Sequence, residues 1–312
     1  MENKQAKIVF MGTPEISAKV LRGLISNGYN ICAVIAQPDR PVGRKKILEP
    51  VPTKKVAEEF NIPVYQKEKI RKDYEFLKEI NPDVIITLAY GQIVPQGLLD
   101  IPRLGCINLH GSLLPKYRGA APIQYALINN EKVTGMTLMK MVKEMDAGEM
   151  YDVEEVEISK DDNSTSLFEK MGEAALRLIL RALPLYLEGK LLGKEQDESL
   201  VTFAPSIKVE EEKLDLDKSK EQLFGYIRAL SDIPGAYLYL DNEKFKIFKA
   251  DIVNDEVSAE VGTIVKADKN GLYLQCVNGQ LALLEIQKEG KKRMDYRSFI
   301  NGNQGLLGKK LS

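Results

Sequence analysis

The stretch Lys7–Ala36, KIVFMGTPEISAKVLRGLISNGYNICAVIA, alternates two short apolar runs with one helical pattern. Residues 7–12 and 31–36 are rich in β-branched and other apolar side chains, which predict buried strands. Between them, residues 14–28 carry apolar side chains at helical spacing, with a proline in the first turn and a glycine as the stop. A strand, a helix and a second strand in this order predict one unit of a parallel sheet.

The rest of the first half continues this pattern. Residues 83–91, DVIITLAYG, and residues 106–110, CINLH, predict two more buried strands, and residues 73–80 predict a helix before them. Residues 164–187 repeat apolar side chains at helical spacing and predict a long helix. We therefore expect an α/β domain with a doubly wound parallel sheet over residues 1–189.

The second half changes character. Residues 190–208 are polar and lack a sustained period, so we expect a linker there. Residues 219–230 predict a helix, and several alternating runs follow, separated by Asp-Asn, Lys-Asn-Gly and Asn-Gly turns. Short strands at such regular spacing predict a small antiparallel β-barrel domain over residues 209–312.

The composition narrows the class of protein. The 312 residues are 44% hydrophobic and 29% charged, and no segment approaches the roughly 18 uninterrupted apolar residues of a membrane span. The first residues do not resemble a signal peptide either, so we expect a cytoplasmic protein with no membrane partner. Cys32, Cys106 and Cys276 are far apart, which argues against a disulfide framework or a zinc cluster.

Charge is distributed unevenly along a chain whose net charge is only -1. Lys and Arg gather in residues 37–55 and again in residues 288–312. Local basic patches on a neutral protein fit a partner that is bound at a few phosphates. A solvated charged surface explains either patch equally well when it is considered alone.

His110, the only histidine, ends the strand CINLH. Asn108 and His110 lie two residues apart, so their side chains share one face of the strand at its carboxyl end, where parallel sheets bind ligands. Gly111 lets the chain turn, and the segment Ser112–Pro115 then presents backbone groups beside the imidazole. These groups could hold negative charge that develops on a carbonyl oxygen. The alternative is a hydrogen-bonded core histidine.

Asp146 follows an amphipathic strand within residues 135–150 and precedes Ala147 and Gly148. An aspartate in a glycine-containing turn is most often a turn or cap residue. The functional alternative is that Asp146 folds back onto His110 and sets its tautomer.

The turn Gly12-Thr13-Pro14 stands where a dinucleotide-binding fingerprint would lie, yet the G-x-G-x-x-G pattern is absent. Pro14 also removes a backbone donor from the first turn of the helix. A nicotinamide-dependent dehydrogenase is therefore disfavoured.

Six blocks of the sequence carry a resemblance to a known family. They are MGTPEIS (11–17), AQPDRPVGRKK (36–46), AYGQIVP (89–95), LGCINLHGSLLPKYRGAAPIQYAL (104–127), TGMTLMKMVKEMDAGEM (134–150) and ESLVTFAPSI (198–207). Through them the chain resembles the methionyl-tRNA formyltransferases, a family of folate-dependent enzymes, over nearly its whole length. The resemblance implies a Rossmann-type N-terminal domain and a C-terminal barrel, similar to an OB fold, that helps to hold tRNA.

The resemblance also implies roles for individual residues. The positions that match catalytic residues of the family are Asn108, His110 and Asp146. Those that match its folate-contacting segment are Ser112, Leu113, Leu114 and Pro115. Arg44 matches a basic residue that meets the acceptor end of the tRNA, and the tRNA-binding residues expected in its loop are Arg40, Arg44, Lys45 and Lys46.

The sequence departs from the family pattern at a few positions. The chain has no tryptophan, so Leu216 and the pair Asp232-Ile233 stand where the family would show one. Glu149 stands where aspartate is common in the family. These departures concern mainly contacts in the second domain.

The reaction implied by the resemblance is formyl transfer from 10-formyltetrahydrofolate to the free α-amine of methionyl initiator tRNA, for translation initiation. It implies no metal and no nicotinamide, and we expect a monomer. One alternative is a folate-dependent formyltransferase for another amine, on a nucleotide sugar or on glycinamide ribonucleotide. The other is a non-catalytic nucleic-acid-binding module, which would leave Asn108, His110 and Asp146 unexplained.

Overall fold

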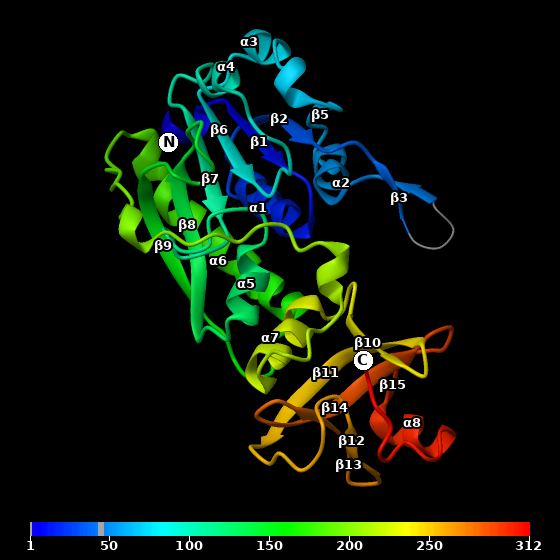
Figure 1. Cartoon of the computed structure of the whole chain (residues 1–312). Coiled ribbons are helices and arrows are strands. Elements are labelled where there is room, and N and C mark those ends of the chain that lie inside the picture. The colour runs from blue at the N-terminus through cyan, green and yellow to red at the C-terminus, as the bar shows by residue number, and fades with distance from the viewer. Residues whose placement is uncertain (1, 43–46) are drawn as a thin grey trace. The chain divides into compact units, whose positions relative to one another are not determined.

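The computed structural model describes residues 2–42 and 47–312, and the chain forms two compact units (Figure 1). The first unit contains the residues up to Pro122, Val133–Glu157 and Phe168–Pro205. The second unit contains Ile123–Lys132, Ile158–Leu167 and Ser206–Ser312. Two segments that precede residue 168 therefore belong to the second unit, and the predicted boundaries at residues 189 and 208 stay a prediction.

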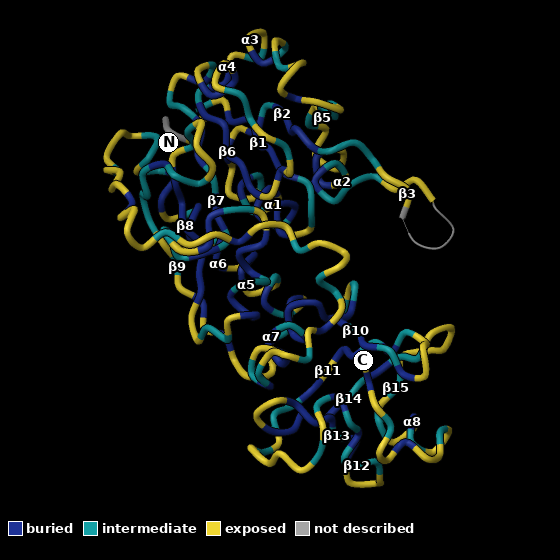
Figure 2. The backbone as a smooth tube through the Cα atoms, viewed as in Figure 1, coloured by how far each residue is buried: buried dark blue, intermediate teal, exposed yellow. Residues whose placement is uncertain are grey.

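The first unit contains a seven-stranded sheet in the order β5-β2-β1-β6-β7-β8-β9. Its strands are β1 (Ile8–Gly12), β2 (Ile31–Ala36), β5 (Val64–Gln66), β6 (Val84–Leu88), β7 (Cys106–His110), β8 (Val133–Lys140) and β9 (Met150–Glu157). The first five strands in this order, β5, β2, β1, β6 and β7, are parallel to one another. Strands β8 and β9 are antiparallel to their neighbours. Every residue of β1 and β6 is buried (Figure 2), so other elements cover both faces of the sheet. The predicted doubly wound parallel sheet is confirmed, with an antiparallel pair at one edge.

Helices alternate with these strands along the chain. They are α1 (Glu15–Ser26), α2 (Pro52–Glu59), α3 (Phe76–Ile80), α4 (Gln96–Leu99), α5 (Pro122–Ile128) and α6 (Ser164–Leu187), with the 3-10 helices η1 (Glu2–Gln5), η2 (Ile70–Lys72), η3 (Glu198–Leu200) and η4 (Val209–Glu212). The helix predicted over residues 164–187 has the bounds of α6. Within the described part of the chain, no helix has both the length and the apolar character that crossing a membrane requires.

The second unit contains an antiparallel sheet in the order β10-β11-β14-β13-β12, with β15 paired to β14. The strands are β10 (Ala236–Leu240), β11 (Glu243–Asn254), β12 (Ile264–Asp268), β13 (Gly271–Cys276), β14 (Gly279–Lys288) and β15 (Met294–Asp295), and helix α8 (Tyr296–Gly302) follows. Ser312 and Tyr239 of the edge strand β10 exchange two backbone hydrogen bonds. At the other edge, the carbonyl oxygen of Lys309 accepts a hydrogen bond from the backbone N–H of Ile264 in β12. Residues 309–312 therefore close the sheet into the predicted small barrel.

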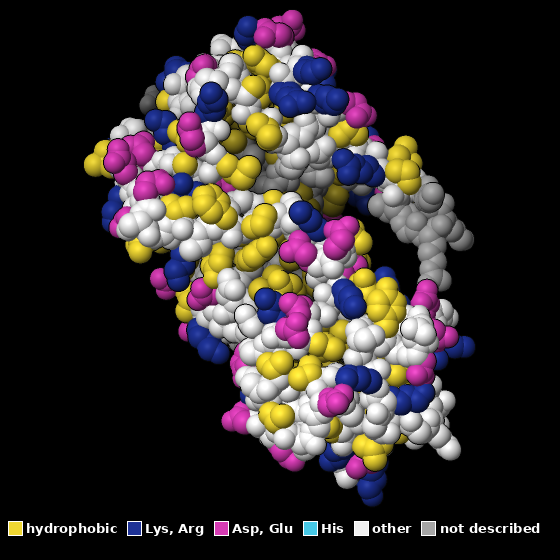
Figure 3. All heavy atoms as spheres, in the orientation of Figure 1, with side chains coloured by type: hydrophobic (Ala, Val, Ile, Leu, Met, Phe, Trp, Pro, Cys, Tyr) yellow, Lys and Arg dark blue, Asp and Glu magenta, His cyan; other side chains and the backbone are white. Residues whose placement is uncertain are grey.

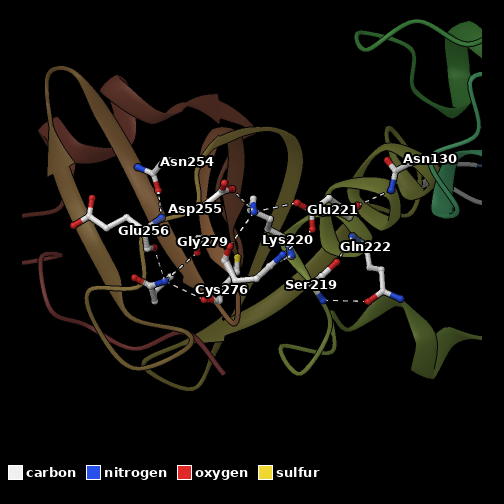
Figure 4. Close-up of polar contacts among 12 residues, drawn as sticks. Asn130, Ser219, Lys220, Glu221, Gln222, Asn254, Asp255, Glu256, Cys276 and Gly279 are labelled. Carbon is white, nitrogen blue, oxygen red and sulfur yellow. Dashed lines mark hydrogen bonds and ion pairs between the residues drawn. The ribbon is translucent and has the colours of Figure 1, made fainter.

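Helix α7 (Lys220–Leu230) begins with a capping box, in which Ser219 and Gln222 each accept a hydrogen bond from the backbone N–H of the other. Beside this cap, Lys220 is only 4% exposed. Its ammonium group donates to the carbonyl oxygen of Asn278 at 2.9 Å and pairs with Asp255 at 2.8 Å (Figure 4). These contacts join the start of α7 to the β13–β14 turn and to the segment after β11.

Arg228 links the two earlier segments, 123–132 and 158–167, to the rest of the second unit. Its guanidinium group donates to the carbonyl oxygen of Ser159 at 3.2 Å and to Oδ1 of Asn130 at 3.0 Å. Burial lowers the pKa of Arg228 below its ordinary value, because the charged form loses hydration. The hydrogen bonds compensate for part of that loss and link α7 to both segments.

Candidate active site

Strand β7 places Asn108 and His110 at the carboxyl end of the sheet, with their side chains on the same face. His110 is buried, and its Nε2 lies 2.9 Å from the carbonyl oxygen of Tyr117. Because a carbonyl oxygen can only accept, Nε2 carries a proton and donates it. The loop that follows β7 thus holds one side of the imidazole, which leaves Nδ1 for a second partner.

Asp146 is that second partner. It lies between β8 and β9 with a φ of 51°, in the left-handed conformation of a turn residue. Its Oδ2 lies 3.6 Å from Nδ1 of His110 and accepts a hydrogen bond from the backbone N–H of Gly119 at 2.9 Å. The longer distance describes an electrostatic contact rather than a hydrogen bond. Asp146 is therefore a turn residue that also faces the imidazole.

Asn108 is only partly buried, and its side-chain amide makes no hydrogen bond to any residue within 2–42 and 47–312. Thr87 of β6 is its partner in register, so the two side chains share one face of the sheet. The Thr87 hydroxyl is buried and also lacks a partner among the described residues. Of these two polar groups, the partly exposed Asn108 amide is therefore the one available to a ligand.

The segment Ser112–Pro115 is held against β8. Thr137 of β8 donates from its hydroxyl to the carbonyl oxygen of Ser112 at 2.6 Å and accepts from the backbone N–H of Leu114 at 3.2 Å. The Ser112 hydroxyl donates to the carbonyl oxygen of Lys116 at 2.6 Å. Ser112 and Leu114 are thereby buried, whereas Leu113 and Pro115 remain partly exposed next to His110 in the chain.

Gln196 connects the Asp146 turn to the loop after β7, although the polar sequence of residues 190–208 predicts a linker there. Its side-chain amide donates to the carbonyl oxygens of Asp146 and Gly148, at 2.7 and 2.8 Å. Its Oε1 accepts two hydrogen bonds from the buried guanidinium group of Arg118, at 2.9 and 3.1 Å. Arg118 also pairs with Glu198 at 2.7 Å. Gln196 thus fixes the backbone that carries Asp146.

Residues 202–204 continue this support. Thr202 accepts a hydrogen bond from the backbone N–H of Tyr117 on its hydroxyl, and another from Arg118 on its carbonyl oxygen, both at 2.9 Å. The backbone N–H of Ala204 donates to the carbonyl oxygen of Arg118 at 2.8 Å. The carbonyl oxygen of Tyr117 in turn accepts the hydrogen bond from Nε2 of His110. In the sequence, residues 202–204 belong to the block ESLVTFAPSI (198–207), which carries part of the family resemblance. The block does not predict which residues they contact.

Other titratable groups near the sheet are unsuited to nucleophilic chemistry. Burial raises the pKa of the Cys106 thiol, on the same strand as His110, to about 12. Burial likewise raises the pKa of Tyr90, after β6, to about 12. Both groups therefore stay protonated at neutral pH and offer no anionic nucleophile.

The predicted tRNA-binding residues lie in the chain between β2 and α2. Arg40 is exposed at the start of β3 (Arg40–Val42), which pairs with β4 (Ile47–Glu49). Arg44, Lys45 and Lys46 lie outside the described residues.

The second basic cluster, residues 288–312, is largely neutralised by carboxylates. Arg293 pairs with Glu285 and with Asp232, where the family would show tryptophan. The remaining pairs are Lys288 with Glu243 at 2.7 Å, Lys309 with Asp241 at 2.5 Å and Lys310 with Glu260 at 2.6 Å. For these four cations the charged-surface interpretation is the simpler one.

Comparison with known proteins now identifies the family. Residues 6–183 match the family described as formyl transferase, and residues 206–304 match the formyl transferase C-terminal domain. The methionyl-tRNA formyltransferases of Bacillus thuringiensis subsp. konkukian and Bacillus anthracis are each 44% identical to this chain, over 98% of both chains. The chain belongs to the formyl transferase family.

Solved structures share the fold of this formyltransferase. The N-formyltransferase from Helicobacter canadensis, in complex with folinic acid and dTDP-3-aminofucose, has a TM-score of 0.66 and 17% identity over 91% of this chain and all of that one. HypX from Aquifex aeolicus, in complex with tetrahydrofolic acid, has a TM-score of 0.66 and 15% identity over 97% of this chain. This chain spans 48% of HypX. At identities of 15% and 17%, the likeness to these two structures supports the fold alone.

Proposed function

We propose that this formyltransferase transfers the formyl group of 10-formyltetrahydrofolate to the α-amine of methionyl initiator tRNA, and so supplies N-formylmethionyl-tRNA for translation initiation. The observation that carries this proposal is the 44% identity to methionyl-tRNA formyltransferases over 98% of both chains. The protein acts in the cytoplasm as a monomer. Its chain is divided into a catalytic domain (1–189), a linker (190–208) and a tRNA-binding domain (209–312).

The end of β7 fits a bound formyl donor. The Asn108 amide lacks a partner among the described residues and is only partly buried, so a polar group of a ligand would satisfy it. The folate-contacting residues in this proposal are Ser112, Leu113, Leu114 and Pro115, which Thr137 holds in place. When bound, 10-formyltetrahydrofolate supplies a formyl carbon that an amine can attack.

Asn108, His110 and Asp146 carry the chemistry in this proposal. An α-amine with a pKa near 8 is about a tenth unprotonated at neutral pH, so the larger barrier lies in stabilising the oxyanion that forms when the amine attacks. Asn108 and the Nδ1–H of protonated His110 donate to that oxygen, since the Nε2–H donates to Tyr117, and a well-placed donor typically contributes about 3–4 kcal/mol. Asp146 orients His110 and helps the amine proton to reach the folate nitrogen, as the new C–N bond forms and the old one breaks.

Basic residues between β2 and α2 bind the acceptor end of the tRNA in this proposal. They are Arg40, Arg44, Lys45 and Lys46. Support comes from the exposed position of Arg40 and from the resemblance that assigns Arg44.

A formylation assay tests the function. The full chain is incubated with 10-formyltetrahydrofolate and either methionyl initiator tRNA or a nucleotide-linked amino sugar, and formylated product is measured. We expect turnover with the tRNA and none with the sugar. Preferential formylation of the sugar would contradict the substrate assignment, and folate binding without turnover on either acceptor would favour a non-catalytic module.

A further inference from the structure

Three large apolar side chains are exposed on segments around the Asp146 turn. Met145, next to Asp146, is 64% exposed, and Leu200 and Phe203, later in the chain, are 57% and 69% exposed. Figure 3 shows hydrophobic side chains exposed on the face of the first unit that residues 190–205 cross. These apolar groups take no part in the chemistry proposed for the site.

Burial in this part of the chain is the reverse of the usual pattern. The polar side chains of Arg118 and Gln196 are buried, whereas Leu200 and Phe203 are exposed. Arg118 and Gln196 are satisfied by each other, and Glu198 pairs with Arg118 at 2.7 Å. The polar groups thus form the internal support of the segment, and its large apolar groups are left for a ligand.

The backbone around Phe203 is fixed on both sides. Arg118 donates from its backbone N–H to the carbonyl oxygen of Thr202 at 2.9 Å, and its own carbonyl oxygen accepts from the N–H of Ala204 at 2.8 Å. A Cβ atom at Gly119 would lie only 2.7 Å from the carbonyl oxygen of Ala204, so the two segments are in direct backbone contact. The Phe203 ring is therefore carried by a held segment and not by a free loop.

The same contact brings Phe203 close to the imidazole. Phe203 pairs with Arg118 in a parallel bridge, and paired backbones lie about 5 Å apart. Tyr117, the residue before Arg118, accepts the hydrogen bond from Nε2 of His110 on its carbonyl oxygen at 2.9 Å. The Cα atom of Phe203 thus lies within roughly 10 Å of the imidazole, which an aromatic ring and a ligand side chain can span together.

The position of these apolar groups indicates which part of a substrate they meet. In the proposed function, Asp146 helps to move the proton of the attacking amine, so the amine lies on the Asp146 side of the imidazole. The amine and the side chain of an aminoacyl group are attached to the same carbon atom, so that side chain comes close to Met145 and Phe203. Because Arg118 and Gln196 already bind each other, an apolar side chain matches this surface better than a charged one.

We propose that Phe203, together with Met145 and Leu200, binds the apolar side chain of the aminoacyl group whose amine is formylated. The inference rests on the proposed function, in which that group is methionyl. A thioether side chain is flexible and makes favourable contacts with the edge of an aromatic ring. Phe203 is thereby a specificity-determining residue, which favours a methionyl group over an aminoacyl group with a short side chain.

Formylation kinetics with two aminoacyl groups on the same initiator tRNA test the proposal. The ratio kcat/KM is measured with methionyl and with alanyl initiator tRNA for the parent, Phe203→Ala and Phe203→Tyr, with Leu192→Ala as the matched control. Leu192, earlier in the same segment, is 85% exposed. We expect Phe203→Ala to lower kcat/KM by about tenfold with the methionyl tRNA and by less than about twofold with the alanyl tRNA. Phe203→Tyr, which keeps the ring, and Leu192→Ala should behave like the parent.

Equal losses with the two tRNAs would overturn the proposal and show that the ring contacts the tRNA itself, for example its terminal base. Unchanged kinetics of Phe203→Ala, or an equal effect of Leu192→Ala, would overturn it as well. Because the ring is exposed, the melting temperature of Phe203→Ala should equal that of the parent, and a large decrease would show that the ring is a structural element instead. These outcomes contradict only the inference, whereas a parent that formylates neither tRNA would contradict the proposed function and the inference with it.

Discussion

His110 is both a hydrogen-bonded buried histidine and a neighbour of a carboxylate. Its Nε2 donates to Tyr117, as a core histidine would, and its Nδ1 faces Asp146 at 3.6 Å. Asn108 differs, because its amide has no partner among the described residues. A side chain without a structural partner on a ligand-binding edge is better explained by function than by stability.

This contrast predicts different outcomes for two substitutions. Asn108→Ala should lower turnover by about a hundredfold or more, because a transition-state donor is lost, and should leave the melting temperature nearly unchanged. His110→Ala should lower turnover similarly and also lower the melting temperature, because it leaves the carbonyl oxygen of Tyr117 without its donor. Formylation kinetics and thermal unfolding of both variants provide the measurement.

Turnover of His110→Ala within about threefold of the parent would return His110 to a purely structural role. A large loss of stability in Asn108→Ala would show that its amide has a structural partner after all.

At the scale of elements, residues 196–204 form part of the site support and not a free connection. Their side chains make hydrogen bonds to the loops around Asp146 and Tyr117 instead of packing into an apolar core. The segment is therefore polar, and its sequence resembles that of a linker. Polar composition alone does not distinguish a solvated segment from one that binds a neighbouring loop.

Gln196 should therefore act as a positioning residue. Gln196→Ala should lower kcat by about tenfold with little change in KM for tRNA, because Asp146 would lose its fixed backbone. Gln196→Glu keeps the acceptor for Arg118 but loses both donors to the Asp146 turn, so it should be as impaired as the alanine variant. Glu195→Ala, at an exposed neighbour, is the control for a local change in this segment and should behave like the parent.

Full activity of Gln196→Glu would show that the Arg118 contact matters and the Asp146 contact does not. A rise in KM alone would point to substrate binding instead of positioning.

At the scale of the whole molecule, the second unit depends on an ionic network around its main helix. Lys220 pairs with Glu221 at 3.0 Å, and Asn278 donates to Glu221 at 2.9 Å. Partial burial acts to raise the pKa of the Glu221 carboxyl, but the hydrogen bonds from Asn278 and Lys220 outweigh it and lower the pKa to about 2. The ordinary value is 4.5, so the folded state favours the charged form.

The sign of the pH dependence follows. Because the folded pKa is depressed, this carboxyl contributes stability above about pH 4.5 and loses the contribution as the pH falls towards 2. The side chain is 45% exposed, so solvent screening reduces the contribution to about 1 kcal/mol. Urea unfolding of the parent and of Glu221→Gln from pH 3 to 7 should show a stability difference at pH 7 that shrinks below pH 4.5. A difference independent of pH would contradict this role.

Local patterns determined much of the fold. The strand Cys106–His110 and the helix Ser164–Leu187 have the predicted bounds, because the period of apolar residues is set by consecutive positions. The shared face of Asn108 and His110 follows from the same periodicity. The sequence also carried the family resemblance, which the comparisons confirmed.

Only the tertiary structure decided which distant segments support the site. Asp146 lies 36 residues after His110, which it contacts, and Gln196 lies 50 residues after Asp146, to which it donates a hydrogen bond. Arg228 donates a hydrogen bond to Asn130, which lies 98 residues earlier in the chain. The same polar residue types are equally compatible with a turn, a linker or the surface of a helix. Hydrogen bonds between segments depend on where packing places the backbone, and no local period records that position.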